Sequence, residues 1–192
     1  MLHRESQVDD QEISEGIRRR DHEAFRALLE RYGPGLFNFL LYRLGNKADA
    51  EDAYAEVLMK VWEHAPVYEE SGRLKAWLFT IAHRRSLDFL ARRRRGSLPL
   101  QGDAAWPGRD ETIASAEPGP EALAHGEEVR ERFMKALAGL PEEQREVFLL
   151  REYGGLSFAQ IVEALECPLG TALARMRYAV LKLRRELEEF HA

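Results

Sequence analysis

Hydrophobic positions recur at helical spacing through most of the chain. In residues 21–32, Phe25 and Leu28 fall on one helix face, and Asp21 precedes them as a candidate N-cap. Residues 36–44 are densely apolar, which is typical of a helix buried on most sides. No stretch alternates between apolar and polar residues with the period of two that a half-buried strand shows. The pattern therefore predicts an all-α protein.

Glycine and proline mark the expected helix ends in the first half of the chain. Gly33-Pro34-Gly35 should interrupt the first helix, and Gly45-Asn46 should end the apolar helix that follows it. Two long helices are then expected over residues 47–64 and 73–94, with a short loop over residues 65–73 between them.

The composition changes at residues 96–120, where glycine and proline are frequent and periodic apolar positions are few. A segment of this kind predicts a flexible linker. It separates two helical units, residues 1–95 and residues 121–192. The sequence therefore predicts two small helical domains joined by a tether.

The second unit carries clear helix boundaries. Pro141 is expected to be the first residue of a helix that Gly154-Gly155 ends. Ser157 and Gln160 have the spacing of a capping box, and Thr171 is a candidate N-cap for a last helix that runs almost to the C-terminus. A short capped helix, a tight turn and a longer basic helix form a helix-turn-helix pattern, which is typical of DNA binding. Helical hairpins without a DNA role share the pattern, so both interpretations stay open.

The distribution of charge matters more than its sum. The net charge of the 192-residue chain is −5, which by itself argues against a nucleic-acid partner. Residues 102–131 alone carry −6, so the remainder is close to neutral and contains two basic stretches. Residues 84–95 hold six arginines and one acid, and residues 175–186 hold five basic residues and one acid. These stretches suit phosphate binding, although solvated helix faces have the same composition.

Other classes of protein are disfavoured. No apolar run approaches the roughly 18 residues that a membrane span needs, the N-terminus lacks a signal-peptide core, and Cys167 has no cysteine to pair with. By elimination we expect a cytoplasmic protein. The chain also has no phosphate-binding loop, metal-ligand cluster or paired nucleophile and base, so we expect neither an enzyme nor a bound cofactor.

Two blocks of residues carry a more specific pattern. The second unit contains Leu140-Pro141-Glu142-Glu143-Gln144-Arg145-Glu146-Val147-Phe148, Arg151, Gly155-Leu156-Ser157-Phe158, Cys167-Pro168-Leu169-Gly170-Thr171 and Arg175. The first contains Ala24-Phe25, Arg31-Tyr32, Asp49-Ala50-Glu51-Asp52, Lys60-Val61-Trp62, Ala76-Trp77-Leu78-Phe79-Thr80-Ile81-Ala82 and Asp88. In this order, on either side of a linker, the blocks resemble regions 4 and 2 of the extracytoplasmic-function (ECF) sigma factors of the sigma-70 family.

The resemblance implies an alternative sigma factor that gives bacterial RNA polymerase its promoter specificity and has no catalytic residues of its own. Region 2 would dock on the clamp helices of the core enzyme and would read and open the −10 element. Region 4 would read the −35 element and touch the flap of the core enzyme. The implied partners are core RNA polymerase, promoter DNA and an anti-sigma factor.

Site residues follow from the matched positions. Core-polymerase contacts are expected at four acids of helix 47–64, for which a solvated surface and a metal site are the alternatives: Asp49, Glu51, Asp52 and Glu56. Aromatic rings beside arginines suit unstacked bases and phosphates, so contacts with the −10 element are expected at Tyr68, Ser71, Trp77, His83, Arg84, Arg85, Asp88, Arg92 and Arg93. Contacts with the −35 element are expected at Arg151, Ser157, Thr171, Ala174, Arg175, Arg177 and Tyr178.

Some positions depart from the family pattern. Arg84 stands where many members have Asn, so the base preference at −10 is not carried over. Leu173 and Ala174 replace two polar types that usually face DNA, and Leu173 forms an apolar line with Val180 and Leu187 at seven-residue spacing. We therefore expect weak −35 recognition and a cover for this helix, either an anti-sigma factor or region 2 of the same chain. A slightly larger local core is the alternative.

Two further hypotheses remain at this stage. A helix-turn-helix regulator that acts without polymerase would explain residues 121–190 but not the acidic and aromatic-basic helices of the first half. A sigma-like protein-interaction module that has lost promoter recognition would explain the altered last helix. Binding to core polymerase would distinguish a sigma factor from the polymerase-independent regulator. Promoter-specific transcription would distinguish a sigma factor from the protein-interaction module.

Overall fold

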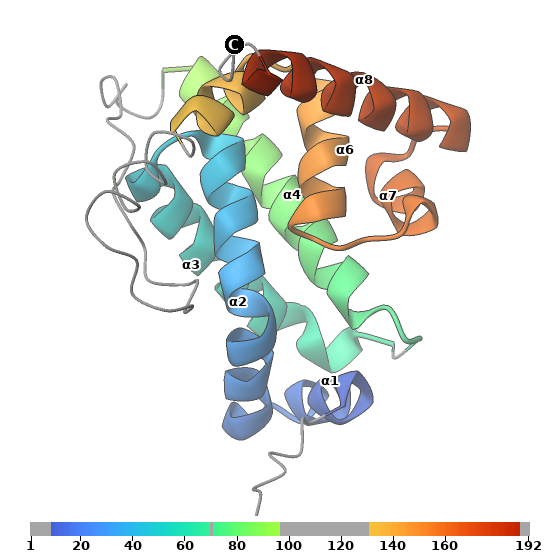
Figure 1. Cartoon of the computed structure of the whole chain (residues 1–192). Coiled ribbons are helices and arrows are strands. Elements are labelled where there is room, and N and C mark those ends of the chain that lie inside the picture. The colour runs from blue at the N-terminus through green and yellow to red at the C-terminus, as the bar shows by residue number, and fades with distance from the viewer. Residues whose placement is uncertain (1–8, 70, 97–130, 189–192) are drawn as a thin grey trace, which may run out of the picture.

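The computed structural model describes residues 9–69, 71–96 and 131–188. These residues form helices and their connections, with no strand among them, so the predicted all-α class is confirmed (Figure 1). No helix in the described ranges is both long enough and apolar enough to cross a membrane. The expected linker after Gly96, and residues 121–130 of the second unit, lie outside the described residues.

The first half of the chain is a helical bundle. Its elements are α1 (Asp10–Arg18), α2 (His22–Leu44), α3 (Lys47–His64), the short 3-10 helix η1 (Ala65–Val67) and α4 (Leu74–Arg94). Helices α2, α3 and α4 pack against one another, and α1 crosses the N-terminal end of α2 (Figure 1). Phe39, Val57 and Leu78 are fully buried where the three long helices meet. The predicted N-cap at Asp21, the stop at Gly45 and the span of α3 are confirmed.

Helix α2 corrects one prediction, because it runs through Gly33-Pro34-Gly35 without a break. Proline removes one hydrogen bond from a helix, but Leu36 and Phe39 beyond it are buried, and this packing stabilises the continuous helix. The glycines allow close approach instead. A Cβ atom on Gly33 would lie 2.8 Å from the Tyr54 hydroxyl, and one on Gly35 would lie 3.2 Å from the Tyr153 carbonyl oxygen.

Helix α1 was not predicted. Asp9 caps it, and the Glu12 carboxylate accepts the backbone N–H of Asp9, which completes a capping box. Ile13 and Ile17, one turn apart, are both buried against the bundle. The Asp-x-x-Glu spacing followed by two isoleucines was therefore a readable sign of this helix.

The second half contains a helical segment over residues 131–138 and then α6 (Glu142–Glu152), α7 (Phe158–Leu165) and α8 (Leu169–Glu188). The predicted capping box of Ser157 and Gln160 is confirmed. Helix α8 begins at Leu169, so Thr171 is not its N-cap as predicted. The Pro168 carbonyl accepts the backbone N–H groups of Thr171 and Ala172, which places Thr171 inside the first turn. Pro141 is the N-cap of α6 rather than its first residue.

The two halves pack against each other, an arrangement that the sequence pattern did not predict. Helix α6 lies against α2, and α7 approaches α4 (Figure 1). Tyr42 of α2 and Tyr153 at the end of α6 have ring centroids 4.5 Å apart. A Cβ atom on Gly154 would lie 3.1 Å from the Phe79 ring, so the glycine lets the two halves approach closely here.

Candidate functional site

A hollow of about 550 Å³ lies beside the start of α4. The loop before α4 contributes Tyr68, Ser71 and Arg73, and α4 itself contributes Trp77 and Arg84. Helix α7 of the second half supplies Gln160 and Glu163. The hollow therefore contains four of the residues expected to contact the −10 element, together with a wall from the other half of the chain.

Two aromatic rings pack against each other at this hollow. The ring centroids of Tyr68 and Trp77 lie 4.6 Å apart with a tilt of 36°. Tyr68 is only 7% exposed, whereas Trp77 is half-buried. Arg84, one of the lining residues, has an exposed side chain. Rings and a guanidinium group at one hollow are the combination that binds an unstacked base and its phosphate.

The arginines at the end of α4 already have partners. Arg85 lies 2.8 Å from Asp88. The Arg92 guanidinium contacts both Glu56 oxygens, at 2.9 and 3.1 Å, and Arg93 lies 3.6 Å from Asp49. Expected −10 residues are thus paired with two of the acids expected to contact polymerase. Both roles stay predictions, and a contact with DNA or with polymerase at these positions would compete with the ion pairs.

His83 is not placed to contact a phosphate in this arrangement. Its side chain faces the interior, and the residue is only 5% exposed. Burial, helped by Arg43 and Arg84, lowers the pKa of His83 to about 4, so the ring is neutral at pH 7. Helical spacing placed His83 on the DNA-facing helix but could not show that its ring is buried.

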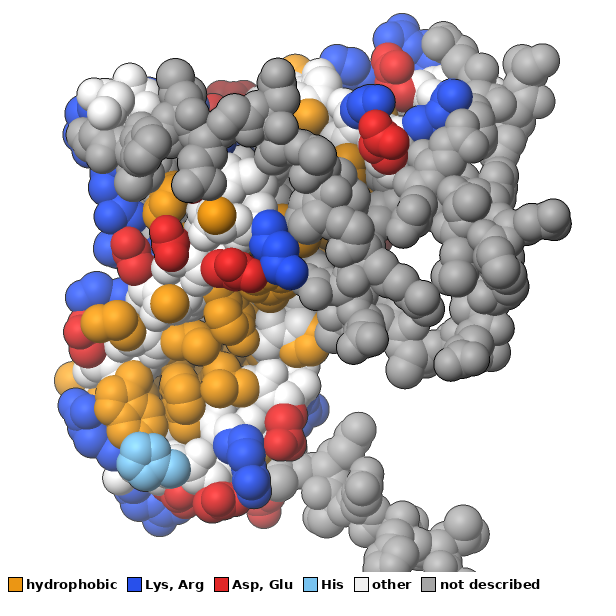
Figure 2. Space-filling model, turned by 90° about the vertical axis from the view of Figure 1, so that its left-hand side faces the viewer, with side chains coloured by type: hydrophobic (Ala, Val, Ile, Leu, Met, Phe, Trp, Pro, Cys, Tyr) orange, Lys and Arg blue, Asp and Glu red, His pale blue; other side chains and the backbone are white. Residues whose placement is uncertain are grey.

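The acids of α3 divide into two groups. Glu51 and Asp52 are exposed, whereas Asp49 and Glu56 are half-buried beside α4. Figure 2 views the face formed by α2 and α3, on which hydrophobic side chains gather. On these helices Trp62 stacks with His22 at 5.0 Å and meets Phe25 edge-on at 5.1 Å. The described residues hold no group of three or more His, Cys, Asp or Glu side chains that could bind a metal ion.

The helix-turn-helix of the second half is formed by α7 and α8. Ser157 accepts the backbone N–H of Gln160 and donates its own backbone N–H to the Gln160 side chain. Arg151 donates to the Leu156 carbonyl at 2.7 Å, and its guanidinium lies over the Phe158 ring. Arg151 and Ser157, two of the residues expected to contact the −35 element, therefore stabilise the local structure, whatever contacts with DNA they make.

Replacing Ser157 with alanine is expected to lower the free energy of unfolding by about 1 kcal/mol, because α7 loses its N-cap. The measurement is urea unfolding followed by circular dichroism. Ser157→Asp is the matched control, since aspartate also caps helices and should keep most of the stability. Equal losses in both variants would contradict a capping role.

The α8 surface is only partly basic. Arg177 and Ala174 are exposed, Tyr178 is 60% exposed, and Arg175 is bound to Glu143 at 2.8 Å. Leu173 and Val180 are 45% and 43% exposed, so neither region 2 nor a larger local core covers them, and both of those expectations are wrong. Of the covers for α8 that the sequence suggested, an anti-sigma factor is the one that remains.

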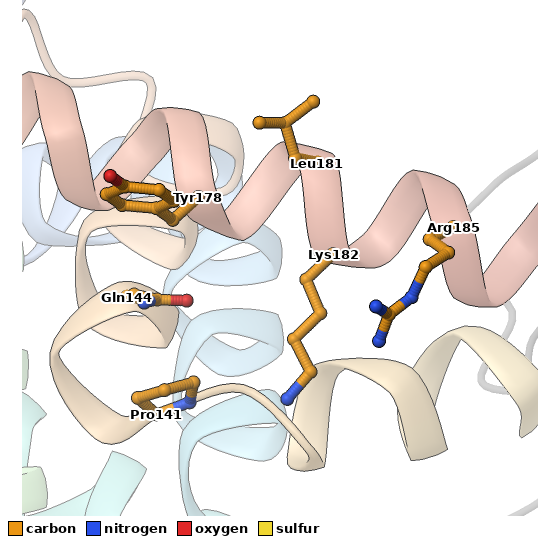
Figure 3. Close-up of a pocket in the computed structure, with 6 residues that line it drawn as sticks. All are labelled: Pro141, Gln144, Tyr178, Leu181, Lys182 and Arg185. Carbon is orange, nitrogen blue, oxygen red and sulfur yellow. The ribbon is translucent and has the colours of Figure 1, made fainter.

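A shallow groove of about 410 Å³ runs along α8 on the side of α6. Figure 3 shows its lining, with Pro141 and Gln144 below the helix and Tyr178, Leu181, Lys182 and Arg185 on it. Leu181 is 51% exposed, which adds to the uncovered apolar surface of α8. This helix therefore presents apolar and basic groups side by side.

Charged residues that the sequence analysis missed lie between the two halves. Arg43 of α2 is fully buried and donates to Glu142 and Glu146 of α6. Arg94 also reaches Glu142, at 2.8 Å. Burial raises the pKa of Glu146, whereas for Glu142 Arg43 and Arg94 outweigh burial and lower the pKa. One sign of this site was available, because Arg43 is the only charged residue in the apolar stretch 36–44.

Comparison with known proteins agrees with this geometry. The family model of sigma-70 region 2 matches residues 28–96, and that of sigma-70 region 4 matches residues 130–183. The chain is 31% identical to the ECF RNA polymerase sigma factor SigK of Mycobacterium ulcerans over 173 residues, 90% of each chain. It is 34% identical to SigL of Mycobacterium tuberculosis over 171 residues, which cover 85% of this chain and 89% of that one.

A solved structure shows the same fold. It is the sigma factor RpoE of Bartonella quintana in complex with the anti-sigma factor NepR. The match has a TM-score of 0.66 and 28% identity, and it covers 85% of this chain and 96% of that one. The chain described here therefore belongs to the extracytoplasmic-function family of RNA polymerase sigma factors.

Proposed function

We propose that the two halves of this chain divide promoter recognition between them. As an ECF sigma factor the protein acts with core RNA polymerase and is not itself an enzyme. In this proposal residues 1–95 dock on the polymerase and read and open the −10 element, residues 121–192 read the −35 element, and residues 96–120 connect them. The place of action is the cytoplasm, where the polymerase works.

The hollow beside α4 is the observation that carries the −10 part of this proposal. Base flipping costs a few kcal/mol, and ring stacking with phosphate contacts can offset it. Trp77 supplies the ring, the buried Tyr68 packs against it, and Arg84 supplies a cation at the same hollow. Ser71 at the rim adds a hydroxyl that can donate to or accept from a base edge.

The α2–α3 face supports the docking part. Glu51 and Asp52 are exposed there, and an exposed apolar patch flanked by charge is typical of a protein interface (Figure 2). Met59 of α3 is 62% exposed. Asp49 and Glu56 would become more available to this interface if Arg93 and Arg92 turned to DNA.

The α8 surface supports weak −35 recognition together with a protein partner. Arg177 is exposed and can reach a phosphate, but Leu173 and Ala174 offer no hydrogen bond to a base edge. Apolar exposure along α8 is the kind of surface that a partner covers. We propose an anti-sigma factor as that partner, in line with the complex of the B. quintana relative.

In vitro transcription tests the function. Core RNA polymerase, this protein and a library of genomic promoter fragments should yield transcripts from defined starts that share upstream motifs. Binding to core polymerase without specific starts would instead support a sigma-like regulator, which the apolar α8 surface also favours. Failure to bind core polymerase would contradict the docking proposal.

A double change in α8 tests the −35 part separately. Leu173→Lys with Ala174→Ser is expected to strengthen −35 binding about tenfold or more, since each restored base or phosphate contact contributes roughly 1–3 kcal/mol. The measurement is holoenzyme binding to promoters with intact and scrambled −35 elements. The matched control is Leu181→Lys, which adds the same charge elsewhere on α8. An equal gain in both variants would show general charge attraction and not −35 recognition.

A further inference from the structure

One ion pair crosses the mouth of the hollow beside α4. The Nη1 atom of Arg73, next to α4, lies 3.2 and 2.9 Å from the two carboxylate oxygens of Glu163 in α7. The two residues are 90 positions apart in the sequence, and both line the hollow. Arg73 was not among the residues expected to contact DNA.

The chemistry of this pair resembles that of a phosphate contact. A guanidinium group binds a carboxylate and a phosphate in the same way, through N–H donors directed at anionic oxygens. Arg73 lies beside Tyr68, Ser71 and Trp77, where the phosphate of a base stacked in the hollow would come within reach. We infer that Arg73 is a phosphate-binding residue of the −10 single strand, and that Glu163 occupies Arg73 as a phosphate mimic in the free protein.

This inference rests on the proposed role of the hollow and adds a regulatory contact to it. Gln160 lines the hollow next to Glu163, so α7 forms one wall of the site where a nucleotide would enter. The loop before α7 also lies close to α4, since a Cβ atom on Gly155 would lie 2.4 Å from Lys75 Nζ. A DNA strand that binds Arg73 therefore competes with Glu163 for its guanidinium group.

The pair is suited to being displaced. The side chains of Arg73 and Glu163 are 57% and 67% exposed, so solvent screens their attraction. Exposed pairs of this kind contribute little, and removing Glu163 should change the affinity for single strands by about two- to fivefold. Separation of the two halves on the polymerase would remove the competition altogether.

The test uses the full chain and a short fluorescent single-stranded oligonucleotide, with affinity measured by anisotropy at fixed salt. Glu163→Gln should tighten binding about two- to fivefold, and Arg73→Gln should weaken it. The double variant should match Arg73→Gln, because Glu163 acts only through Arg73. The matched control is Glu152→Gln, which removes the same charge from an exposed position of α6. Equal gains in the Glu163 and Glu152 variants would overturn the inference.

Two more measurements separate this inference from the proposed function. In the complex with core polymerase, Arg73→Gln should still weaken promoter opening, while Glu163→Gln should have no effect. Trp77→Ala tests the hollow itself. If Trp77→Ala weakens single-strand binding but Glu163→Gln leaves it unchanged, Glu163 is not a phosphate mimic, while the proposed −10 site at the hollow is kept. If Trp77→Ala has no effect on either readout, the −10 site is wrong, and the inference fails with it.

Discussion

Replacing Glu142 and Glu146 together by glutamine is expected to separate the two halves of the free protein. Both carboxylates accept hydrogen bonds from Arg43, whose side chain is fully buried. The Nε and Nη1 atoms of Arg43 are also buried and have no hydrogen-bond partner among the described residues. Removing the charged partners of a buried ion costs about 3–5 kcal/mol, because the remaining charge is left uncompensated.

Opening is the expected response because it returns Arg43 to water. The first half keeps its own core around Phe39, Val57 and Leu78, and the second half keeps Leu150 and Ile161 buried around α6 and α7. The cost of the buried charge therefore acts mainly on the contact between α2 and α6 and less on either half alone. Arg94 would also lose its partner Glu142.

Small-angle X-ray scattering measures the result as an increase in the radius of gyration, with helix content by circular dichroism as the check on folding. Glu143→Gln is the matched control, since Glu143 lies on the same helix but binds Arg175 of α8. A double variant that stays as compact as the control and loses stability as a whole would contradict a role in closure. If the double variant also binds single strands more tightly, then the contacts of Arg43 with Glu142 and Glu146 help to keep Glu163 beside Arg73 in the free protein.

The helices were predictable because their signals are local. Apolar spacing, caps and glycine stops act over one to three turns, and they gave α3, α4 and the capping box of α7 correctly. The break expected at Pro34 was wrong because burial on both sides of the proline outweighed its local cost. Thr171 was predicted as the N-cap three residues too late, because α8 begins at Leu169 and the Pro168 carbonyl accepts its first backbone N–H groups.

For the candidate sites, the sequence predicted which residues have suitable chemistry but not how they are arranged in space. Tyr68, Trp77 and Arg84, each expected to contact the −10 element, line one hollow, and the sequence pattern did not predict that they would meet. The pairing of Arg43 with Glu146 joins residues 103 positions apart, and helical periodicity carries no information on such contacts. The same limit applies to His83, because the sequence places it on α4 but does not show that its surroundings are buried. Long-range packing therefore decides which of the expected residues are available to DNA.

Acidification from pH 7 to pH 5 is expected to destabilise the folded protein through His83. Burial is the main cause that lowers the pKa of this histidine to about 4, and the positive charges of Arg43 and Arg84 add to it, while Glu142 opposes it. An unfolded histidine has a pKa of about 6.5, so below that value the unfolded chain takes up the proton first. The neutral ring thus contributes stability above pH 6.5 that is lost as the pH falls towards 4.

The size of this effect follows from the two pKa values. A difference of about 2.5 units corresponds to roughly 3 kcal/mol over the whole range, and about 2 kcal/mol of it is lost by pH 5. Urea unfolding at pH 7, 6 and 5 measures the loss. His83→Gln is the comparison, because it keeps a polar side chain at the site but cannot take up a proton, and its stability should fall less steeply.

Two neighbouring carboxylates also have shifted pKa values, and the comparison with His83→Gln removes their contribution. Burial raises the pKa of Glu146, so its protonation favours the folded state as the pH falls, whereas the lowered pKa of Glu142 acts in the opposite direction. Both groups are present in the wild type and in the variant, so the difference between the two pH curves isolates the histidine. Parallel curves would show that His83 does not carry the acid sensitivity. A difference that disappears in Glu142→Gln with Glu146→Gln would show that His83 is buried by closure of the two halves, because opening exposes the ring and returns its pKa to the ordinary value.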